Sequence, residues 1–439
     1  MSHKHFHLKE RRKMKLKTLT TAIILVTLPM TGAFAASLDR SGQSISAFLQ
    51  PGNYFEAGIS VLDPNVSGKV RNEYSPNATP PSVIGLQNTN ISDMGDDYYF
   101  PSAALKLQVT DNFSFGLIYD RPFGADVTYS LSDPASAAAG GLGLFHNGTE
   151  SLEVEVKTQS ISMLLGYQPT ENFNFYAGPV YQTIEGDAQF RGLAFGGNNS
   201  FGGYNLNIKE TGGVGWLVGI AYQIPEIALK ASVTYRSEID HEMTINESSI
   251  ATLGQNIGTF INMNNGLEQT KITTPQSVNL DFQTGIMANT VAFANARWVN
   301  WKDFTIRPYA FGVASEIAGP SVGKPNGFDL AAYSDDQWSA NIGIGRKLND
   351  QWTGNISVGW DSGAGNLVTA LGPTEGYWNL GLGAQFSPTP QTFISGGVKY
   401  FWLGDANLQT SAQFNTPNYV AEFKDNHAIA YGLKMGYKF

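Results

Sequence analysis

Few residues of this 439-residue chain have the types and spacing that catalysis needs. The chain has no cysteine, which excludes disulfides, thiol nucleophiles and cysteine-bound metals. Asp240-His241-Glu242 is an acid–histidine cluster, but neither G-x-S-x-G nor H-E-x-x-H occurs. The acid pairs Asp96-Asp97 and Asp335-Asp336 are typical of solvated or cation-binding loop ends. We therefore expect a protein that is not an enzyme and that has no metal site and no cofactor.

Cationic side chains placed within apolar alternation could instead bind an anion. Lys230 and Arg236 have the same parity on one predicted strand, and Arg297 lies within another. A guanidinium can hold a carboxylate through two parallel hydrogen bonds, so these three residues are candidates for carboxylate binding. The alternative for Arg236 is an internal ion pair with Glu238 or Asp240, and the residues alone leave both interpretations open.

The elements that must position these cations are β-strands, because the apolar residues recur with period two. Such alternation lets one face of a strand meet lipid and the other a lumen, which is the pattern of a membrane barrel. No apolar run of about 18 residues follows residue 35, so we expect no membrane-spanning helix. The chain ends on an aromatic residue, as such barrels commonly do. In the last segment Ile429, Tyr431, Leu433, Met435, Tyr437 and Phe439 alternate with Ala430, Gly432, Lys434, Gly436 and Lys438.

The connections between predicted strands fall into two classes, and their number gives the topology. Six short and seven long connections join fourteen strands, an even number with both chain ends on the short-turn side. The sequence therefore predicts an all-β fold, a fourteen-stranded antiparallel transmembrane β-barrel. The short connections fall at 110–112, 168–172, 223–226, 287–289, 349–351 and 387–390. The long ones are about 63–97, 125–150, 187–206, 246–268, 304–335, 362–375 and 404–426.

Tyr and Trp residues lie near many predicted strand ends. They could form a stacking platform for a ligand, but a girdle at the membrane–water interface is the simpler interpretation. The residues concerned are Tyr54, Tyr98, Tyr99, Trp298, Trp301, Trp338, Trp352, Trp360, Trp378 and Trp402.

The N-terminus predicts export. Residues 1–35 combine a basic start, an apolar stretch and the cleavage-like Ala33-Phe34-Ala35, as in a signal peptide, with Met14 as an alternative start. Its removal leaves 21 basic and 36 acidic residues, a net charge of −15, which argues against nucleic acid as a partner. We expect residues 36–53 to form a short N-terminal plug and residues 54–439 the barrel, a monomer surrounded by bacterial outer-membrane lipid.

Several segments of the chain resemble the FadL family of outer-membrane transporters for long-chain fatty acids and other hydrophobic compounds. The strongest is Thr274–Phe304, with its T-P-x-S opening and W-x-x-W-x-x-F close. Tyr54–Gly68, with its D-P-x-V-x-G exit, and Asp111–Gly124 are similar to the first and third strands of that family. Val214–Ile239 and the tail Asp335–Phe439 also match, so the resemblance covers most of the mature chain.

The resemblance implies a fourteen-stranded monomeric barrel closed by an N-terminal hatch. It further implies that a hydrophobic ligand is caught among the outer loops and moves to a lumenal pocket near the hatch. The ligand would then leave sideways through a gap at a kink in the third strand. The segment before the first strand is shorter here than the family hatch and lacks its Asn-Pro-Ala.

The resemblance implies particular residues for each part of the ligand's route through the barrel, namely the kink, the hatch and the outer groove. The kink is expected at Pro122-Phe123-Gly124, because proline cannot donate to a strand ladder and glycine marks a bulge, unless the strand merely ends there. The apolar hatch residues would be Leu38, Ile45, Phe48 and Leu49, in a segment that could otherwise be a disordered leader. The outer groove would be formed by Leu142, Leu144, Phe145, Leu193, Phe195 and Phe201, which could otherwise pack loop on loop.

The sequence thus predicts passive uptake of a long-chain fatty acid. An aromatic hydrocarbon transporter of the same family is the first alternative, since only the pocket separates the two. A general diffusion porin is the second alternative, and a surface-exposed enzyme or adhesin is a further one.

Overall fold

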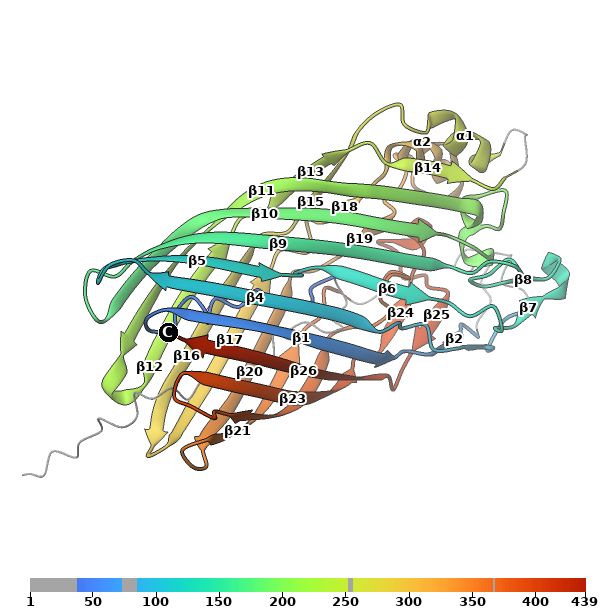
Figure 1. The fold of residues 1–439 in the computed structure, drawn as a ribbon. Coiled ribbons are helices and arrows are strands. Elements are labelled where there is room, and N and C mark those ends of the chain that lie inside the picture. Colours follow the sequence, from blue (N-terminus) through green and yellow to red (C-terminus); the bar gives the residue numbers. More distant parts are fainter. Residues whose placement is uncertain (1–37, 73–84, 252–255, 366–367) are drawn as a thin grey trace, which may run out of the picture.

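The barrel wall is a closed antiparallel sheet of fourteen strands, one of them broken (Figure 1). The computed structural model describes residues 38–72, 85–251, 256–365 and 368–439, so the predicted signal peptide lies outside the described residues. β5 and β6 both pair with β9 and together form the broken third strand. The wall strands are β1 (Tyr54–Asn65), β4 (Tyr98–Gln108), β5 (Phe113–Asp120), β6 (Gly124–Thr128), β9 (Glu153–Tyr167), β10 (Phe173–Gln189), β11 (Tyr204–Ile224), β12 (Leu229–Arg236), β16 (Ser277–Met287), β17 (Thr290–Val299), β20 (Gln337–Lys347), β21 (Trp352–Asp361), β22 (Tyr377–Phe386), β23 (Thr392–Leu403) and β26 (His427–Lys438).

The first and last strands pair along their whole length and so close the barrel. β1 pairs with β26 from Tyr54↔Lys438 to Asn65↔His427. The six tight connections between strands fall where the sequence predicts them, and the predicted fold class is confirmed. Because short turns face the periplasm in such barrels, both ends of the wall lie at the periplasmic end and the long loops at the outer end.

Period-two alternation produces the lipid-facing surface. Leu433, Leu382 and Ile342 point outward and more than half of each side chain is exposed, as a wall in contact with lipid requires. Trp338, Trp352, Trp378 and Trp402 also point outward, in agreement with an interfacial girdle.

Three residues assigned to that girdle point inward instead, so this part of the prediction was wrong. Tyr54, Tyr98 and Trp301 are buried. Tyr54 Oη donates to Glu56 Oε2 at 2.6 Å, and Trp301 Nε1 donates to Gln337 Oε1 at 2.7 Å. An aromatic side chain with a polar tip can enter the lumen when the tip finds a partner there.

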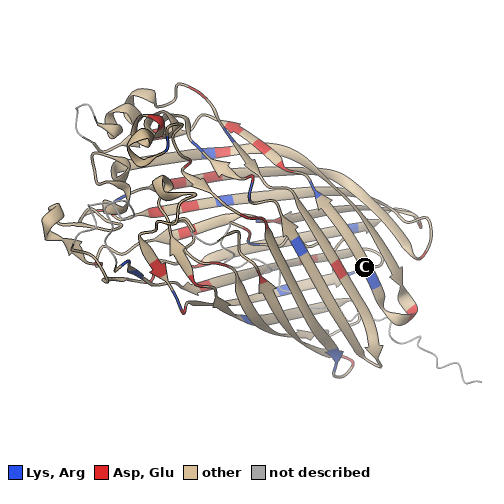
Figure 2. Cartoon of the chain, turned by 180° about the vertical axis from the view of Figure 1, so that it is seen from behind, with Lys and Arg blue, Asp and Glu red and all other residues tan. Residues whose placement is uncertain are grey.

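The outward face of β9 is apolar toward the periplasmic end and charged toward the outer end. The outward residues Ile161, Met163 and Leu165 are apolar, whereas Lys157 and Glu155, nearer the outer end, are charged and paired with each other. Figure 2 shows acidic residues gathered on the half of the molecule that carries the long loops. The hydrocarbon of the membrane therefore ends near Ile161 on this side.

The long loops fold into small sheets and helices over the outer end. Glu247 fixes one helix there, since its carboxylate accepts from the backbone N–H groups of Ala310 and Phe311, both at 2.8 Å, at the helix start. Within the described residues no helix has the length and apolar character needed to cross a membrane. The strands are β2 (Gly68–Val70), β3 (Asn90–Ile91), β7 (Ala135–Ser136), β8 (Leu142–Gly143), β13 (Ile239–Met243), β14 (Asn246–Ser249), β15 (Thr270–Thr274), β18 (Thr305–Ile306), β19 (Ala331–Ala332), β24 (Ala406–Leu408) and β25 (Ala421–Phe423). The helices are α1 (Ile257–Asn264) and α2 (Tyr309–Ala318), with 3-10 turns at η2 (Ala137–Ala139), η3 (Leu193–Phe195), η4 (Phe201–Gly203), η5 (Pro225–Ile227), η6 (Gly319–Val322) and η7 (Ser411–Gln413).

Candidate functional site

The segment before β1, residues 38–53, lies against the inner wall of the barrel, and we call it the N-terminal segment (Figure 1). Its four predicted apolar residues, Leu38, Ile45, Phe48 and Leu49, are all buried. The Phe48 N–H donates to Ile45 O at 3.0 Å, which makes a tight turn, and the Phe48 ring meets Tyr176 of β10 edge-on at 5.7 Å. Burial of these apolar side chains against the wall is what a plug requires.

Two of the three predicted cations hold the beginning of this segment. Arg297 Nε donates to Asp39 Oδ2 at 2.7 Å and its Nη2 donates to Gln43 Oε1 at 2.9 Å. Arg236 Nη2 donates to Gln43 O at 3.0 Å. The two arginines, on β17 and β12, therefore meet at one residue of the N-terminal segment, with Asn279 of β16 donating to Gly42 O at 2.8 Å beside them.

The third predicted cation holds the other end of the segment. Lys230 Nζ donates to Leu49 O at 2.6 Å, and Lys106 of β4 donates to Gln50 O at the same distance. Lys230 is thus separated from the arginine pair, although it shares a strand and a face with Arg236. Lys106 was missed by the sequence analysis; its inward parity on β4 was the signal that could have identified it.

Among the described residues Arg236 does not pair with Glu238 or Asp240, the alternative that the sequence left open. Arg236 Nη1 donates to Ser162 Oγ at 3.2 Å, while Asp240 pairs with Lys271 at 2.6 Å. Burial beside the N-terminal segment places the guanidinium away from these loop carboxylates.

The third strand is broken at the predicted residues. β5 ends at Asp120 and β6 begins at Gly124, and Phe123 between them bonds to Thr158 of β9 through its N–H at 2.9 Å. Pro122 O accepts from the Arg40 N–H at 2.7 Å. The Gly124 N–H donates to Leu38 O at 2.9 Å. The N-terminal segment therefore supplies the backbone partners of the break and covers it from inside.

Gly124 allows this close approach. A Cβ atom at this position would lie 1.8 Å from Tyr98 Oη and 2.8 Å from Val156 O, so a side chain would force its neighbours to move.

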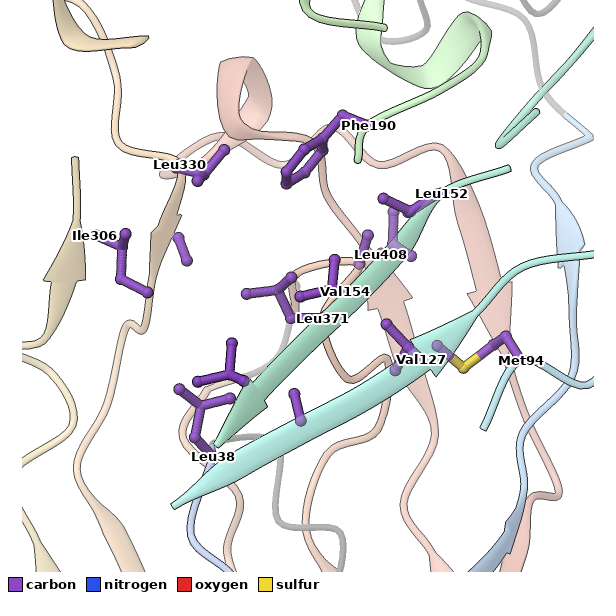
Figure 3. Packing of buried hydrophobic residues seen from close by; sticks show 14 of the residues in the cluster. Leu38, Met94, Val127, Leu152, Val154, Phe190, Ile306, Leu330, Leu371 and Leu408 are labelled. Carbon is purple, nitrogen blue, oxygen red and sulfur yellow. The ribbon is translucent and has the colours of Figure 1, made fainter. Parts of the chain in front are cut away.

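A large cluster of buried hydrophobic side chains, which we call the apolar interior, lies on the outer side of the N-terminal segment. Its members come from the wall, for example Val154 and Val156 of β9, and from the outer loops. Figure 3 shows side chains from several elements turned toward one another, with Leu38 of the N-terminal segment among them. The labelled residues are Leu38, Met94, Val127, Leu152, Val154, Phe190, Ile306, Leu330, Leu371 and Leu408.

The six residues predicted to line an outer groove belong to this same region. Leu144, Phe145 and Leu193 are buried within it. Leu142, Phe195 and Phe201 are partly buried and pack against it. Ring contacts join the loops, with Phe145 and Phe195 at 6.1 Å and Phe201 and Phe311 at 4.9 Å. In this state they pack loop on loop and turn inward, which is the alternative that the sequence left open.

The loop between β21 and β22 folds inward and was not foreseen. Leu371 is buried in the apolar interior, and the neighbouring Ala370 O accepts from Tyr129 Oη at 3.2 Å. At the foot of this loop, burial raises the pKa of Glu375 to about 8. Glu375 Oε1 accepts from the Gly365 N–H at 3.1 Å, and Oε2 has no partner among the described residues.

The acid–histidine cluster lies on β13, where His241 is paired in register with Ile272 of β15, a member of the apolar interior. His241 is fully buried between Thr211 O and Gln182 Oε1, each at 3.2 Å. Within the described ranges no group of three or more His, Asp or Glu side chains is arranged to hold a metal ion. The described residues thus form an apolar interior that is bounded on its periplasmic side by the N-terminal segment. Arg236, Arg297 and Lys230 hold that segment by hydrogen bonds.

Comparisons with known proteins agree with this architecture. The sequence profile described as "Outer membrane protein transport protein (OMPP1/FadL/TodX)" matches residues 44–439. A Pseudomonas aeruginosa FadL homologue has a similar solved structure, with a TM-score of 0.64 and 14% identity over 90% of this chain and 92% of that one. The Pseudomonas putida toluene transporter TodX gives 0.57 and 14% identity over 94% and 99%. The Ralstonia pickettii toluene transporter TbuX gives 0.53 and 12% over 94% and 97%. No curated protein sequence matches the chain.

Proposed function

The chain belongs to the OMPP1/FadL/TodX family of outer-membrane transport proteins, and from this premise we propose that it carries long-chain fatty acids passively across the outer membrane. The family is one of β-barrel transporters for hydrophobic compounds. The observation that carries the proposal is that the apolar interior lies against the N-terminal segment, which in turn covers the break in the third strand.

The apolar interior suits the tail of such a ligand. A C16 chain buries about fifteen methylene-sized units at about 0.8 kcal/mol each, or about 12 kcal/mol before the costs of association. We infer that the tail enters by parting the six inward-packed loop residues, Leu142, Leu144, Phe145, Leu193, Phe195 and Phe201. The loops would thus form a groove only when a ligand is present.

The carboxylate would bind at Arg236 and Arg297. Both guanidinium groups are buried, and each donates to the N-terminal segment as well as to the wall. The wall acceptors are Ser162 Oγ for Arg236 and Asn279 Oδ1 for Arg297. A ligand carboxylate could replace Asp39 as the acceptor of Arg297 through charge-assisted hydrogen bonds. We propose that this exchange loosens residues 38–43, with Leu38 as the apolar contact that first meets the ligand.

The exit would be the break at Pro122, Phe123 and Gly124. The N-terminal segment now occupies its backbone donors and acceptors, so a displaced segment would leave a gap in the wall. Ile45, Phe48 and Leu49, held by Lys230 and Lys106 at the other end, would keep the rest of the plug in place as a hatch. Uptake would follow the concentration gradient, in a monomeric barrel exported by a cleaved signal peptide over residues 1–35.

The aromatic hydrocarbon alternative is favoured by one specific observation. The apolar interior is rich in rings, with Tyr129 and Phe145 at 4.3 Å and Phe190 and Phe195 at 5.1 Å. Flat apolar ligands can stack on such rings. The similar TodX and TbuX structures are those of toluene transporters. A general porin is disfavoured because the N-terminal segment is hydrogen-bonded to opposite sides of the wall, to Lys106 of β4 and to Arg297 of β17.

Direct binding separates these substrates. Oleate should bind the detergent-purified protein with a micromolar or lower Kd that toluene does not change, and Arg236→Ala should weaken it about tenfold. Arg346→Ala, an exposed residue at the short-turn end, serves as the control. Tight toluene binding with weak oleate binding would favour the hydrocarbon transporter, and binding of neither would overturn the proposal.

A further inference from the structure

The wall of the barrel is incompletely paired beside the break in the third strand. The ladder between β4 and β5 ends at Ala103↔Tyr119, yet β4 reaches back to Tyr98. Beyond the break, β6 pairs with β9 and not with β4 in the described ladders. The outer end of β4, residues 98–102, therefore pairs with β1 on one side, and its other side, which faces the break, is open in the described ladders.

A small cavity of about 40 Å³ lies at this open side. Its lining includes Phe100, Pro101 and Ser102 of β4 and Asp120 and Arg121 at the break. One water molecule needs about 10–15 Å³ of such space, so the cavity has room for a carboxylate group but not for an alkyl chain.

Arg121 brings a positive charge without an ion-pair partner to this cavity. Its hydrogen bond in the described part of the chain runs from Nη1 to Tyr99 O at 3.5 Å, which is long for such a bond. Its Nε is buried and has no partner among the described residues. The neighbouring cation, Lys157 opposite Gly124, is instead paired with Glu155. Because guanidinium N–H groups only donate, Arg121 retains the capacity to bind an anion.

The two carboxylates of the cavity lining have other partners. Glu56 Oε1 accepts from Lys434 Nζ at 2.9 Å. Asp120 Oδ2 accepts from Ser41 Oγ of the N-terminal segment at 3.1 Å. Neither carboxylate therefore takes up the donors of the arginine beside them.

A second unpaired donor lies at the same break. The Tyr98 side chain is 5% exposed, and its Oη has no hydrogen-bond partner within the described ranges. This oxygen lies against Gly124, since a Cβ atom there would be 1.8 Å from it. Buried hydroxyl groups normally have partners. A hydroxyl and a guanidinium that both have donors to spare indicate a place for an anion at the break.

We propose that Arg121 and Tyr98 form an exit site, which binds the carboxylate of the fatty acid as the ligand passes through the break. The inference rests on the function proposed above, and it adds a position for the carboxylate after Arg236 and Arg297. Arg121 supplies charge-assisted hydrogen bonds and the Tyr98 hydroxyl donates one more. The site selects an anion, so a fatty acid uses it and a hydrocarbon such as toluene does not.

The cysteine-free chain allows a direct test in the full-length protein. Ser102 lines the cavity, so Ser102→Cys places a single thiol there. In an uncharged detergent, oleate should slow the reaction of this thiol with a small maleimide at least fivefold, whereas oleyl alcohol at equal concentration should slow it less than twofold. Ser387→Cys, in the turn after β22, should be protected by neither. Equal protection of Ser102→Cys by the two ligands, or none by oleate, would overturn the proposal.

A lipid phosphate is the other anion that could reach these donors. Dioleoylphosphatidic acid presents a phosphate on a lipid with two chains. It should protect the Ser102→Cys thiol less than oleate does. Stronger protection by this lipid would assign the donors to a membrane lipid and would contradict an exit site for the ligand.

Variants of the two donors locate the recognition. In the Ser102→Cys background, Arg121→Gln should raise the oleate concentration needed for half protection about tenfold, and Tyr98→Phe should raise it about threefold. Lys157→Gln removes a neighbouring charge that is already paired, and should change it less than twofold. An unchanged response of Arg121→Gln, in protein shown to be folded by heat-dependent gel mobility, would sink the assignment.

Direct oleate binding separates failure of the exit site from failure of the proposed function. The Kd of Arg121→Gln for oleate should stay within twofold of the parent value, because the apolar interior and the two buried arginines are intact. Tight oleate binding without protection of the thiol would remove the exit site and leave the fatty acid function standing. Absence of oleate binding to the parent protein would remove both. A tenfold weaker Kd in Arg121→Gln would place this residue in the first binding step and would also refute an exit role.

Discussion

Asp39 and Arg297 form a buried ion pair across 258 positions of the chain, with Oδ2 and Nε 2.7 Å apart. One belongs to the N-terminal segment and the other to β17, so the pair attaches this segment to the wall. Breaking a buried pair by removing one charge typically costs about 3–5 kcal/mol, because the remaining charge stays buried without its partner.

Asp39→Asn should therefore release the beginning of the N-terminal segment. A thiol introduced by Ser41→Cys, buried in the parent protein, should react with a water-soluble maleimide at least tenfold faster in the Asp39→Asn background. Asp350→Asn breaks an exposed pair with Lys347 and should change nothing. Identical rates in all three backgrounds would show that the ion pair does not hold the segment.

Gly124→Ala tests the break in the third strand. The new Cβ would collide with Tyr98 Oη and Val156 O, so the start of β6 must shift where Gly124 now donates to Leu38 O. We expect oleate release into liposomes to change at least threefold while oleate affinity stays within twofold. Gly372→Ala, where a Cβ meets no atom within 4 Å, is the matched control. A parallel loss of affinity would place Gly124 in the binding site instead.

Leu371→Asn tests the apolar interior. It replaces a buried apolar side chain of the inward loop by an amide that finds no partner there, and unpaired polar groups are unfavourable in such surroundings. Oleate affinity should fall about tenfold. Leu131→Asn makes the same change at a half-exposed loop position and should leave affinity unchanged. Equal affinities of the two variants would exclude Leu371 from the ligand's surroundings.

Glu375 should make the inward loop sensitive to pH. Its pKa is about 8 in the folded loop and near 4.5 when solvated, so the folded loop binds more protons than the open loop between these values. The loop should therefore be most stable below about pH 4.5, lose stability as pH rises, and reach a minimum above pH 8. Hydrogen exchange of the Val368 and Gln409 amides, corrected for intrinsic rates, measures this opening. Glu375→Gln should remove the pH dependence, and an unchanged profile would contradict the assignment.

The barrel could be predicted from the sequence, because a membrane requires apolar and polar residues to alternate along every wall strand. The tight turns at 110–112 and 349–351, for example, followed from short polar breaks between such strands. The kink at Pro122 was also predictable, since proline cannot donate to a ladder.

The inner contacts could not be predicted, because they depend on residues far apart in the chain. Nothing local to Arg297 indicates that its partner is Asp39, and nothing local to Glu247 indicates that it begins α2. Trp301 was misassigned because its parity depends on the residues beyond the end of β17, where the alternation stops. The inward course of the loop after β21 likewise depends on Tyr129 and Leu408, not on its own composition.

The position of the break relative to the charged upper wall has a consequence for how a molecule would leave. In the register of β9, Tyr119 of β5 lies opposite Ile161 and Gly124 of β6 lies opposite Lys157. The break therefore falls where lipid tails give way to head groups. A fatty acid emerging there could turn its tail down into the hydrocarbon while its carboxylate stayed in water, so the charged group would never have to enter the apolar layer.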